Sequence, residues 1–493
     1  MKLKNIKLNF EDREFFHLVE KTTFRNPFSS GREKALQELT GVTDVVGGKL
    51  KELARATVQK KINKLDLKDA ANFNYYKDED KRLVRVGLLY DAFYLFRNKF
   101  DVLIQDQIEA GDKPISVSFA DDVLTLLEKR GFNHEEAIRY LAFFYQLRRA
   151  FFFINNTLVG QSQSMRKLRS NLWSNIFTQD PRWYENFLWD RMEDFSTFLV
   201  GETGTGKGTA AAALGRSGFI PYLENKNQFA ESFTNNFIDI NLSQFPETLI
   251  ESELFGHKKG AFTGAVEDHE GVFKRCRKYG AILLDEIGDI SIAVQIKLLK
   301  VLENRSFTIV GGHYKERFQG RVIAATNKCL EDLRKEEKFR DDFYYRLCSD
   351  VIYVPSLREQ INEDPNSLEI LLNHTLQRII GGPAENMVVE LKNIISRDLG
   401  PTYEWPGNVR ELEQAVRRIL LTKQYKGDLC DATTIKPVQF INDIEDGNLS
   451  AQEVMSSYCN MLYSKHGTYE EVAKITKLDR RTVKKYIMAF KQN

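Results

Sequence analysis

A glycine-rich loop in the middle of the sequence is suited to binding the phosphates of a nucleotide. It reads Gly-Glu-Thr-Gly-Thr-Gly-Lys over residues 201–207, between an apolar run at 198–200 and an alanine-rich stretch at 209–214. A strand, a glycine loop and a helix in this order present backbone N–H groups to phosphates, and the lysine reaches the terminal ones. The predicted ATP-binding residues are Gly201, Glu202, Thr203, Gly204, Thr205, Gly206, Lys207, Gly208 and Thr209.

An acidic pair downstream supplies the groups that hydrolysis of ATP requires. Asp285 and Glu286 end the apolar run Ile282–Leu284. Asp285 would hold Mg²⁺ directly or through water, and Glu286 would orient and polarise the attacking water. Two exposed acids at a strand end are the alternative, which the phosphate-binding loop disfavours. In the general loop motif, the residue after the lysine is Ser or Thr and binds the metal ion. This chain has Gly208 there, with Thr209 next. Thr209 is therefore a weaker candidate metal ligand than Asp285.

The segment between these two motifs contains a hexapeptide suited to contacting a partner. Gly-Ala-Phe-Thr-Gly-Ala, residues 260–265, places one aromatic and one β-branched hydroxyl residue among small residues. Glycine supplies backbone freedom, so the pattern is typical of a mobile loop that presents Phe262 and Thr263. A plain turn with a packed phenylalanine is the alternative. A partner loop inserted into an ATP site indicates ATP-driven work on another macromolecule.

The order of these motifs resembles the AAA+ activators of sigma-54 RNA polymerase, the bacterial enhancer-binding proteins. The resemblance rests on residues 201–207, on Glu-Ser-Glu-Leu-Phe-Gly-His-Lys-Lys-Gly-Ala-Phe-Thr-Gly-Ala at 251–265, and on Leu-Leu-Asp-Glu-Ile-Gly-Asp at 283–289. It implies that Phe262 and Thr263 contact sigma-54. It covers residues 158–420 densely and 450–490 more loosely.

The same resemblance implies further residues of the site. Asn241 would restrain the catalytic glutamate, and Asn327 would sense the γ-phosphate. Arg340 and Arg346 match the arginine fingers, which act on the nucleotide of the adjacent subunit, and Arg410 matches the arginine of the lid. For each arginine, a surface ion pair is the alternative. Fingers acting between subunits imply a ring, a hexamer by resemblance, and a poorly active monomer.

The predicted fold is multidomain: a mostly helical N-terminal region, an α/β AAA+ core with a helical lid, and a small all-α helix-turn-helix. Strands are expected at 198–200, 237–240, 281–284 and 321–325, alternating with helices as in a parallel sheet. The expected boundaries are 1–157 for the regulatory domain, 158–358 and 359–425 for the AAA+ subdomain and lid, 426–449 for a linker, and 450–493 for the DNA-binding domain. Segment 175–194 has no assigned role.

The first 157 residues match no family that we can name. Capping-box patterns at Ser118–Asp121 and Asn133–Glu136 each precede apolar residues at helical spacing, and Gly131 would stop the first of these helices. The second helix carries Phe143, Phe144 and Phe151–Phe153, which we interpret as core or helix–helix contact rather than a cofactor site. No receiver-domain pattern is present. The signal, a small molecule, a partner protein or direct sensing, stays open, as does the sign of control.

The C-terminal segment carries a local basic excess, with 8 Lys/Arg against 4 Asp/Glu over residues 450–493. Two short helices are expected around 468–476 and 480–488, the second capped by Asp479 and packed through Val483 and Ile487. This is helix-turn-helix geometry and resembles Fis-like domains. The residues expected to contact enhancer DNA are Arg480, Arg481, Lys484 and Lys485. A basic, solvated helix is the alternative.

Composition sets the remaining expectations. A chain of 493 residues with 42% hydrophobic and 28% charged residues is typical of a globular protein of about three domains. The net charge of +2 gives no information on partners. Five scattered cysteines without metal-ligand spacing favour reduced thiols in a cytoplasmic protein. No apolar run of eighteen residues is present, so no membrane partner is expected.

The leading hypothesis is therefore an ATPase that binds upstream DNA, forms a ring and remodels sigma-54 RNA polymerase from closed to open complexes. The alternatives are a DNA-binding regulator that uses ATP only as a ligand switch, and an AAA+ protein that remodels another target. The expected cofactors are ATP and Mg²⁺. The target promoters and the DNA sequence preference cannot be read from the chain.

Overall fold

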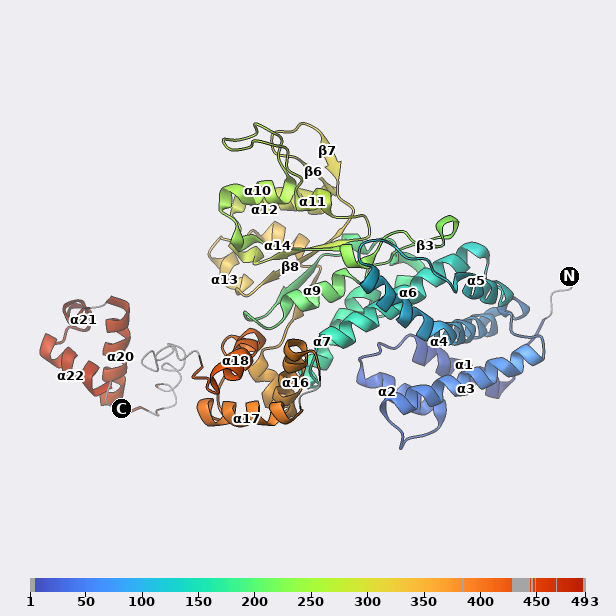
Figure 1. The fold of residues 1–493 in the computed structure, drawn as a ribbon, viewed down its shortest axis with the longest axis horizontal. Coiled ribbons are helices and arrows are strands. Elements are labelled where there is room, and N and C mark those ends of the chain that lie inside the picture. The colour runs from blue at the N-terminus through green and yellow to red at the C-terminus, as the bar shows by residue number, and fades with distance from the viewer. Residues whose placement is uncertain are drawn as a thin grey trace. The chain divides into compact units, whose positions relative to one another are not determined.

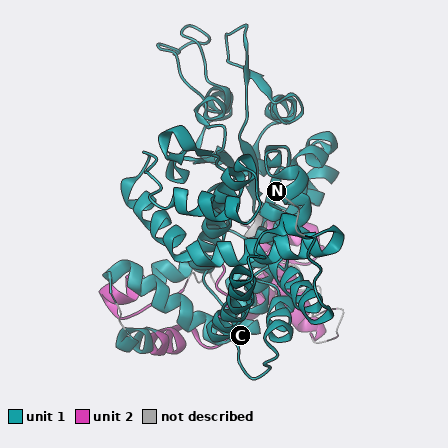
Figure 2. Cartoon of the chain, turned by 90° about the vertical axis from the view of Figure 1, so that its right-hand side faces the viewer, with its two compact units in different colours: residues 1–391, 407–416 teal, residues 392–406, 417–493 magenta. Residues whose placement is uncertain are grey.

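The computed structural model describes residues 5–382, 385–427, 444, 447, 449–466 and 468–490. These residues divide into two compact units (Figure 2), the first comprising residues 1–391 and 407–416 and the second 392–406 and 417–493. The boundary expected at residue 157 therefore falls inside the first unit. Most of the linker expected at 426–449 lies outside the described residues.

A five-stranded parallel sheet forms the centre of the first unit (Figure 1), in the order β4-β5-β8-β1-β9. Each of the four predicted strands is present, and β9 is an edge strand that the sequence analysis did not identify. Branched and aliphatic side chains on both faces explain the burial of the three central strands. The strands are β1 (Thr197–Val200), β4 (Phe237–Asn241), β5 (Ala281–Asp285), β8 (Arg321–Thr326) and β9 (Asp350–Tyr353).

Helices and two small antiparallel pairs surround this sheet. One pair joins β2 (Tyr222–Leu223) to β3 (Gln228–Phe229), and the other joins β6 (Ser306–Thr308) to β7 (Lys315–Arg317). Apolar residues of the sheet and helices form a continuous core. The helices of this part are α9 (Lys207–Gly215), α10 (Glu247–Phe255), α11 (Val272–Arg275), α12 (Ile292–Asn304), α13 (Leu330–Lys335) and α14 (Asp341–Leu347).

The described part of the first 157 residues is mostly helical, as predicted. The Asn133–Glu136 capping box is confirmed at the start of α6. The Ser118–Asp121 prediction is wrong, because α5 begins at Ala120 after Phe119 and has no side-chain cap. The helices are α1 (Phe10–Thr23), α2 (Ser30–Thr40), α3 (Gly47–Leu67), α4 (Asp78–Ala110), α5 (Ala120–Lys129) and α6 (His134–Thr157).

Helix α6 is joined to the end of α9 by buried hydrogen bonds. The Arg149 guanidinium donates to the carbonyl oxygens of Arg216 (2.8 Å) and Gly218 (2.6 Å). The Gln146 side-chain amide donates to the Ser217 carbonyl oxygen at 3.0 Å. Both side chains are buried, so they satisfy backbone carbonyls at the end of α9 that have no helical partner.

Helix α7 (Gln163–Phe177) connects these helices to the sheet. Its Asn175 accepts hydrogen bonds from the Thr197 hydroxyl in β1 (3.0 Å) and from Arg321 in β8 (2.7 Å), and it donates to Asp350 in β9 (2.7 Å). Most of the segment at 175–194, which has no assigned role, follows α7 and contains the short helices α8 (Pro181–Trp183) and η2 (Tyr184–Leu188). Tyr184 is fully buried and donates to Gln146.

The expected lid is helical and consists of α15 (Leu357–Glu363), α16 (Asn366–Ile380), α17 (Glu385–Leu399) and α18 (Asn408–Thr422). The first turns of α18 belong to the first unit. In the second unit, the predicted C-terminal helices are present as α20 (Ala451–His466), α21 (Tyr469–Thr476) and α22 (Arg480–Phe490). They enclose a small core in which Val472, Val483 and Ile487 are fully buried.

Within the described ranges, no helix combines the length and apolar character that crossing a bilayer requires.

Candidate functional site

The candidate residues of the ATP site lie at the carboxyl edge of the sheet. The phosphate-binding loop follows β1, the acidic pair ends β5, Asn327 follows β8, and Asn241 ends β4. Because all of these strands are parallel, their carboxyl ends share one edge. Ligands of open α/β sheets bind at that edge. The fold thus brings together groups that are 34 (Lys207 and Asn241) to 120 (Lys207 and Asn327) positions apart in the chain.

The phosphate-binding loop has the backbone of an anion cradle. Gly204 and Gly206 have φ angles of 80° and 96°, which only glycine adopts readily, and Gly206 immediately precedes α9. The Lys207 ammonium donates to the carbonyl oxygens of Gly201 (2.8 Å) and Glu202 (3.1 Å). Burial lowers the pKa of Lys207, while the nearby carboxylates of Glu286 and Asp285 raise it. The loop therefore holds a cation between its own backbone and the acidic pair.

Glu286 has the environment expected of a general base. Its φ of 55° is left-handed, and its backbone N–H donates to Asp285 Oδ1 at 3.0 Å. One carboxylate oxygen, Oε2, is buried without a hydrogen-bond partner among the described residues. Burial raises the pKa of Glu286, and the charge of Asp285 raises it further. An acceptor oxygen with no partner is available to bind a water molecule.

The two asparagines flank the acidic pair. Asn241 pairs in register with Asp285 across β4 and β5, and its Oδ1 accepts from the Ser243 backbone N–H (3.0 Å) and hydroxyl (2.7 Å). Asn327 is exposed and donates to the Thr203 hydroxyl at 2.8 Å. Asn327 thus joins the end of β8 to the phosphate-binding loop.

The start of α18 lies directly on the phosphate-binding loop. A Cβ added to Gly204 would lie 2.2 Å from the Gly407 carbonyl oxygen and 3.1 Å from Arg410 Cβ. The Val409 N–H donates to the Gly204 carbonyl oxygen at 3.1 Å. The Arg410 side chain is exposed, and its charge contributes to lowering the pKa of Lys207. The predicted lid arginine is therefore close enough to Lys207, the predicted phosphate-binding lysine, for the two charges to interact.

A second contact to the loop was missed by the sequence analysis. Asn408, fully buried, donates to Glu202 Oε2 (3.1 Å) and to the Thr203 carbonyl oxygen (3.0 Å), and accepts from the Leu357 N–H (2.7 Å). Arg358 donates to Glu202 at 2.8 Å and forms an ion pair with it. An asparagine directly after Pro-Gly was the available signal, because asparagine tolerates the left-handed φ of 54° found here.

The two candidate arginine fingers are exposed on α14 and the residue before it. Arg340 forms an ion pair with Asp342 at 2.6 Å. Arg346 donates to the Leu302 carbonyl oxygen of α12 at 2.8 Å. The described contacts of both side chains involve neighbouring surface groups rather than Lys207, Asp285 or Glu286. Both guanidinium groups are therefore on the exposed surface of α14 and the residue before it.

The predicted partner loop projects from the core together with the β6–β7 hairpin (Figure 1). Phe262 and Thr263 are exposed, and the Phe262 ring meets the His257 ring edge-on at a centroid distance of 4.9 Å. The base of the loop is closed by two reciprocal backbone hydrogen bonds between His257 and His269. The Gly260 N–H donates to the Ala265 carbonyl oxygen at 2.8 Å, so the hexapeptide is itself a closed turn.

The hairpin beside this loop was also missed. The Lys258 N–H donates to the Val310 carbonyl oxygen at 3.0 Å, and the Val310 N–H donates to the Gly256 carbonyl oxygen at 2.9 Å. A Cβ on Gly311 would lie 2.7 Å from Ala261 Cβ. The adjacent glycines 311 and 312 between two short runs were the sequence signal for a hairpin. The two projecting segments are thus connected where they leave the core.

In the second unit, the four predicted DNA-contacting side chains are exposed on α22. The Arg481 N–H donates to Asp479 Oδ1 at 2.8 Å, which confirms the predicted cap. Arg480 forms an ion pair with Glu470 of α21 at 2.9 Å. The exposed face of α22 is therefore basic, opposite the face buried through Val483 and Ile487.

Comparisons with known proteins match the part of the chain that carries this site. Residues 188–353 match the family model of the sigma-54 interaction domain. The regulatory protein AtoC of Escherichia coli is 34% identical over 302 residues, covering 56% of this chain and 61% of AtoC. NtrC of Azospirillum brasilense is 38% identical over 46% of this chain and 43% of NtrC. The Nif-specific regulatory protein of Azotobacter vinelandii is 39% identical over 53% of this chain and 44% of that protein.

The chain therefore spans about half the length of these curated relatives. Among solved structures, NtrX from Brucella abortus in complex with ATP aligns over 76% of this chain and 80% of that chain, with 18% identity and a TM-score of 0.41, a likeness too low to bear on the site. The matched segment contains the phosphate-binding loop, the partner loop, the acidic pair and both candidate fingers. Residues 188–353 of this chain are therefore similar to the sigma-54 interaction domain, and the part of the chain shared with AtoC and NtrC is 34–38% identical to them.

Proposed function

We propose that this protein hydrolyses ATP to remodel sigma-54 RNA polymerase from closed to open promoter complexes. The observation that carries the proposal is the position of two features within one matched domain. The carboxyl edge of the sheet assembles Lys207, Asp285 and Glu286, and the same domain projects Phe262 and Thr263 into solvent. A nucleotide site and an exposed partner loop on one rigid core are the parts that such an activity requires.

In the proposed reaction, the phosphate-binding loop fixes the triphosphate and Lys207 neutralises charge on its terminal phosphates. Glu286 orients a water molecule through its free Oε2 and accepts its proton as the water attacks the γ-phosphorus. ADP and phosphate are the products. Asp285 is the residue that we propose would hold Mg²⁺, and the ion would stabilise the negative charge of the phosphates when bound. Thr209 is exposed, and its role as a ligand stays the weaker proposal.

We further propose that the active species is a ring, in which Arg340 and Arg346 of one subunit complete the site of its neighbour. Their described contacts are with the surface of α12 and α14, so both guanidinium groups are accessible to another subunit. A guanidinium at the γ-phosphate stabilises charge that develops during transfer. The resemblance favours a hexamer.

The nucleotide state would reach the partner loop through the sheet. Asn327 contacts the phosphate-binding loop, and Asn241 lies beside the acidic pair on β4, which leads into α10 and the loop at 256–271. Loss of the γ-phosphate would change the contacts of these asparagines. The proposed partner of the moving loop is sigma-54, and the proposed role of α22 is to hold the ring at enhancer DNA.

The decisive experiment measures two quantities on the full chain: ATP turnover, and open-complex formation by sigma-54 polymerase on a promoter that carries a binding site for this protein. We expect Thr263→Ala and Phe262→Ala to keep ATP turnover within about twofold but to abolish opening. Val266→Ala is the matched control, because Val266 is exposed in the same loop outside the hexapeptide. It should retain both activities.

The outcomes separate the candidate functions. A chain that binds ATP but does not hydrolyse it would support the ligand-switch alternative and contradict our proposal. Turnover without opening, by both the full chain and the Val266→Ala control, would indicate another remodelling target. If the Thr263→Ala variant formed open complexes at the rate of the unmodified chain, the hexapeptide would not have the proposed role in remodelling.

A further inference from the structure

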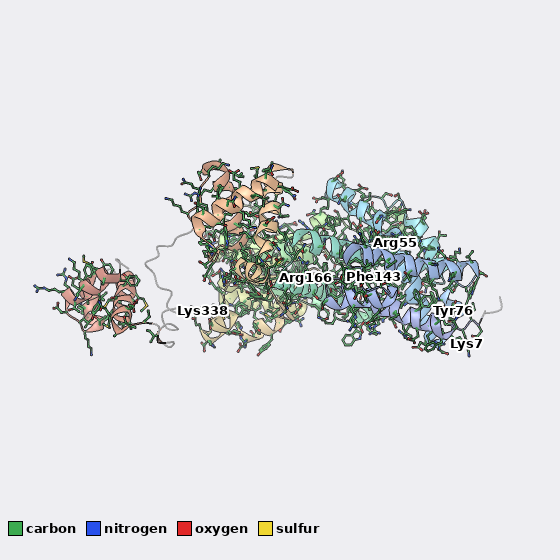
Figure 3. All side chains as sticks on the ribbon, turned by 90° about the horizontal axis from the view of Figure 1, so that it is seen from below. Lys7, Arg55, Tyr76, Phe143, Arg166 and Lys338 are labelled. Carbon is green, nitrogen blue, oxygen red and sulfur yellow. The ribbon has the colours of Figure 1, made fainter. Side chains whose placement is uncertain are left out.

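The helical N-terminal region contains a pocket that the proposed function does not use. It lies between α4, α6 and α7, and its volume is about 390 Å³. Phe143, one of its lining residues, lies among the helices of the first unit (Figure 3). Pockets of this volume accommodate small organic ligands. The aromatic residues that we interpreted as packing between helices thus also form the wall of a cavity.

The wall of the pocket is aromatic. Trp173 and Phe177 come from α7, Phe144 and Phe151 from α6, and Phe93 from α4. Several of these rings contact each other, with centroids 5.5 Å apart for Phe93 and Phe144 and 4.6 Å apart for Trp173 and Phe177. Rings held in this way present fixed faces and edges, which favours a flat aromatic occupant.

The polar residues of the pocket are predominantly basic. Arg25, Arg32, Lys51, Arg97 and Arg148 line it, against two acidic residues. Partial burial lowers the pKa of Lys51, and the charges of Arg32 and Arg97 lower it further, although Glu33 opposes this effect. Arg32, Lys51 and Arg97 therefore line one cavity, with Lys51 an exposed residue on which the other two charges act. An anion placed there would relieve their mutual repulsion.

The two acidic residues in the wall are already engaged. Asp101 accepts a hydrogen bond from Arg148, which lies 2.6 Å away as an ion pair. Glu185 pairs with Arg85 at 3.3 Å and accepts from the Tyr140 hydroxyl. Neither carboxylate is therefore the counter-ion of Lys51 or Arg97. Glu33 offsets part of the charge of Lys51, and the remaining positive charge of the pocket is available to an anionic ligand.

A buried hydroxyl supplies one more group for recognition. Tyr90 lines the pocket and is 3% exposed, and its hydroxyl oxygen has no hydrogen-bond partner among the described residues. Burial raises the pKa of Tyr90, and the neighbouring Tyr94 hydroxyl raises it further, so Tyr90 is a neutral donor. Tyr94 itself accepts from Arg32 at 3.1 Å. A buried donor without a partner is a group that a ligand oxygen could satisfy.

We propose that this pocket binds a small aromatic carboxylate, with its ring between α4, α6 and α7 and its carboxylate among Arg32, Lys51 and Arg97. The ligand would be the signal of the N-terminal region. Its position matters because α7 carries Trp173 and Phe177 in the pocket wall and, between them, Asn175 bonded to three strands of the sheet. A bound ligand would therefore contact α7, the helix that is hydrogen-bonded to the ATPase core through Asn175.

The test measures binding to the full chain without nucleotide, so its result is independent of the proposed ATPase. The probe is 2-naphthoate, and 2-naphthalenemethanol is its neutral counterpart of similar size. Titration calorimetry gives the affinity of each. We expect naphthoate to bind about tenfold or more tightly than the alcohol.

Three variants locate the binding. Lys51→Gln should weaken naphthoate about tenfold and leave the alcohol within about twofold. Lys64→Gln, an exposed position on the same helix α3 outside the pocket, is the matched control and should change neither. Leu147→Trp should fill the cavity and abolish binding of both, while circular dichroism and thermal melting verify that the variant is folded.

Each of the other outcomes would overturn the proposal. Absence of naphthoate binding at millimolar concentration would show that the pocket is not a carboxylate site. Equal affinity for the acid and the alcohol, unchanged by Lys51→Gln, would show an apolar site without anion recognition. Binding that survives Leu147→Trp in a folded protein would place the ligand elsewhere.

Discussion

The side-chain amide of Asn408 donates to the Glu202 carboxylate over 3.1 Å, which joins the first turn of the lid helix α18 to the phosphate-binding loop. The same asparagine accepts the Leu357 N–H, so one buried residue connects the loop, the start of α15 and the start of α18. A change in the position of the loop must therefore be accompanied by a change in the lid, or else break these hydrogen bonds.

Replacing Asn408 should destabilise the protein and uncouple the loop from the lid. Asn408→Ala leaves the buried Leu357 N–H without an acceptor, at a cost of about 1–3 kcal/mol, and puts alanine at a left-handed φ, at a cost of about 1 kcal/mol. Urea unfolding would measure the loss, and fluorescent ATP binding should weaken in parallel. The control is Asn156→Ala at an exposed position of α6. Unchanged stability of the Asn408 variant would contradict this role.

The raised pKa of Glu286 predicts a stability gain on its removal. A carboxyl whose folded pKa lies above its unfolded value contributes stability that is full below the unfolded pKa and is lost as pH rises through the folded pKa. At pH 7.5 the ionised Glu286 therefore disfavours the folded state. Glu286→Gln should unfold at higher urea than the unmodified chain at pH 7.5, and the difference should shrink toward pH 4.3.

The same substitution should abolish ATP hydrolysis, because glutamine cannot accept a proton from water. Glu303→Gln, exposed at the end of α12, is the matched control for both measurements. If Glu286→Gln hydrolysed ATP at the normal rate, another group would have to be the base. If its stability advantage were equal at all pH values, the cause would not be ionisation.

The proposal of shared sites predicts complementation between inactive variants. Lys207→Ala and Arg340→Ala should each lose most ATP turnover, because one lacks the phosphate-binding lysine and the other the finger. In an equimolar mixture, about a quarter of the interfaces would combine an intact loop with an intact finger, so turnover should partly recover. Lys338→Ala, exposed two residues before the finger, should remain active alone.

The ring also requires that the specific ATPase activity of the unmodified chain rise with protein concentration. A constant specific activity in a monomeric preparation, with no recovery on mixing, would show that Arg340 does not act between subunits.

The basic face of α22 predicts DNA binding that weakens steeply with salt. Arg481→Gln and Lys485→Gln should each reduce the slope of log affinity against log salt concentration by about one. Fluorescence anisotropy with duplex DNA at several salt concentrations measures the slope. Lys474→Gln on α21, where the lysine pairs with Glu471, is the control and should leave the slope unchanged. Affinity independent of salt would rule out phosphate contacts through this face.

The sequence predicted the α/β core well, because its strands and loops carry strong local signals. The apolar runs at 198–200 and 281–284 are found as β1 and β5, each within one residue of the expected bounds. In the phosphate-binding loop, glycines occupy positions where the backbone has a positive φ, so the residue type alone indicates the local conformation. Features of this kind depend on neighbouring residues only, so they can be predicted without knowledge of the tertiary fold.

The parts that could not be predicted depend on contacts between distant segments. Asn408 and Glu202 are 206 positions apart, and neither residue alone indicates the other. The edge strand β9 carries the short apolar run Val351–Tyr353, but only Ile352 is buried within it, because the strand pairs with β1 on one side only. The pocket of the N-terminal region combines residues from α1, α2, α3, α4, α6, α7, α8 and η2, and no local sequence pattern indicates that they meet. Ser118 has the sequence of a cap, but Phe119 and Ala120 determine where α5 begins.

The hydrogen bonds from Arg149 and Gln146 to the end of α9 have a consequence for how the chain can be divided. A fragment that starts at residue 158 would lose both donors and leave the carbonyl groups of Arg216, Ser217 and Gly218 without them. The apolar side of α9 that packs on α6 would become solvent-exposed. Truncation at this point would impair folding itself, and loss of activity in such a fragment would say nothing about regulation. Point substitutions in the pocket keep α6 in place, so they distinguish an effect on regulation from an effect on folding better than truncation does.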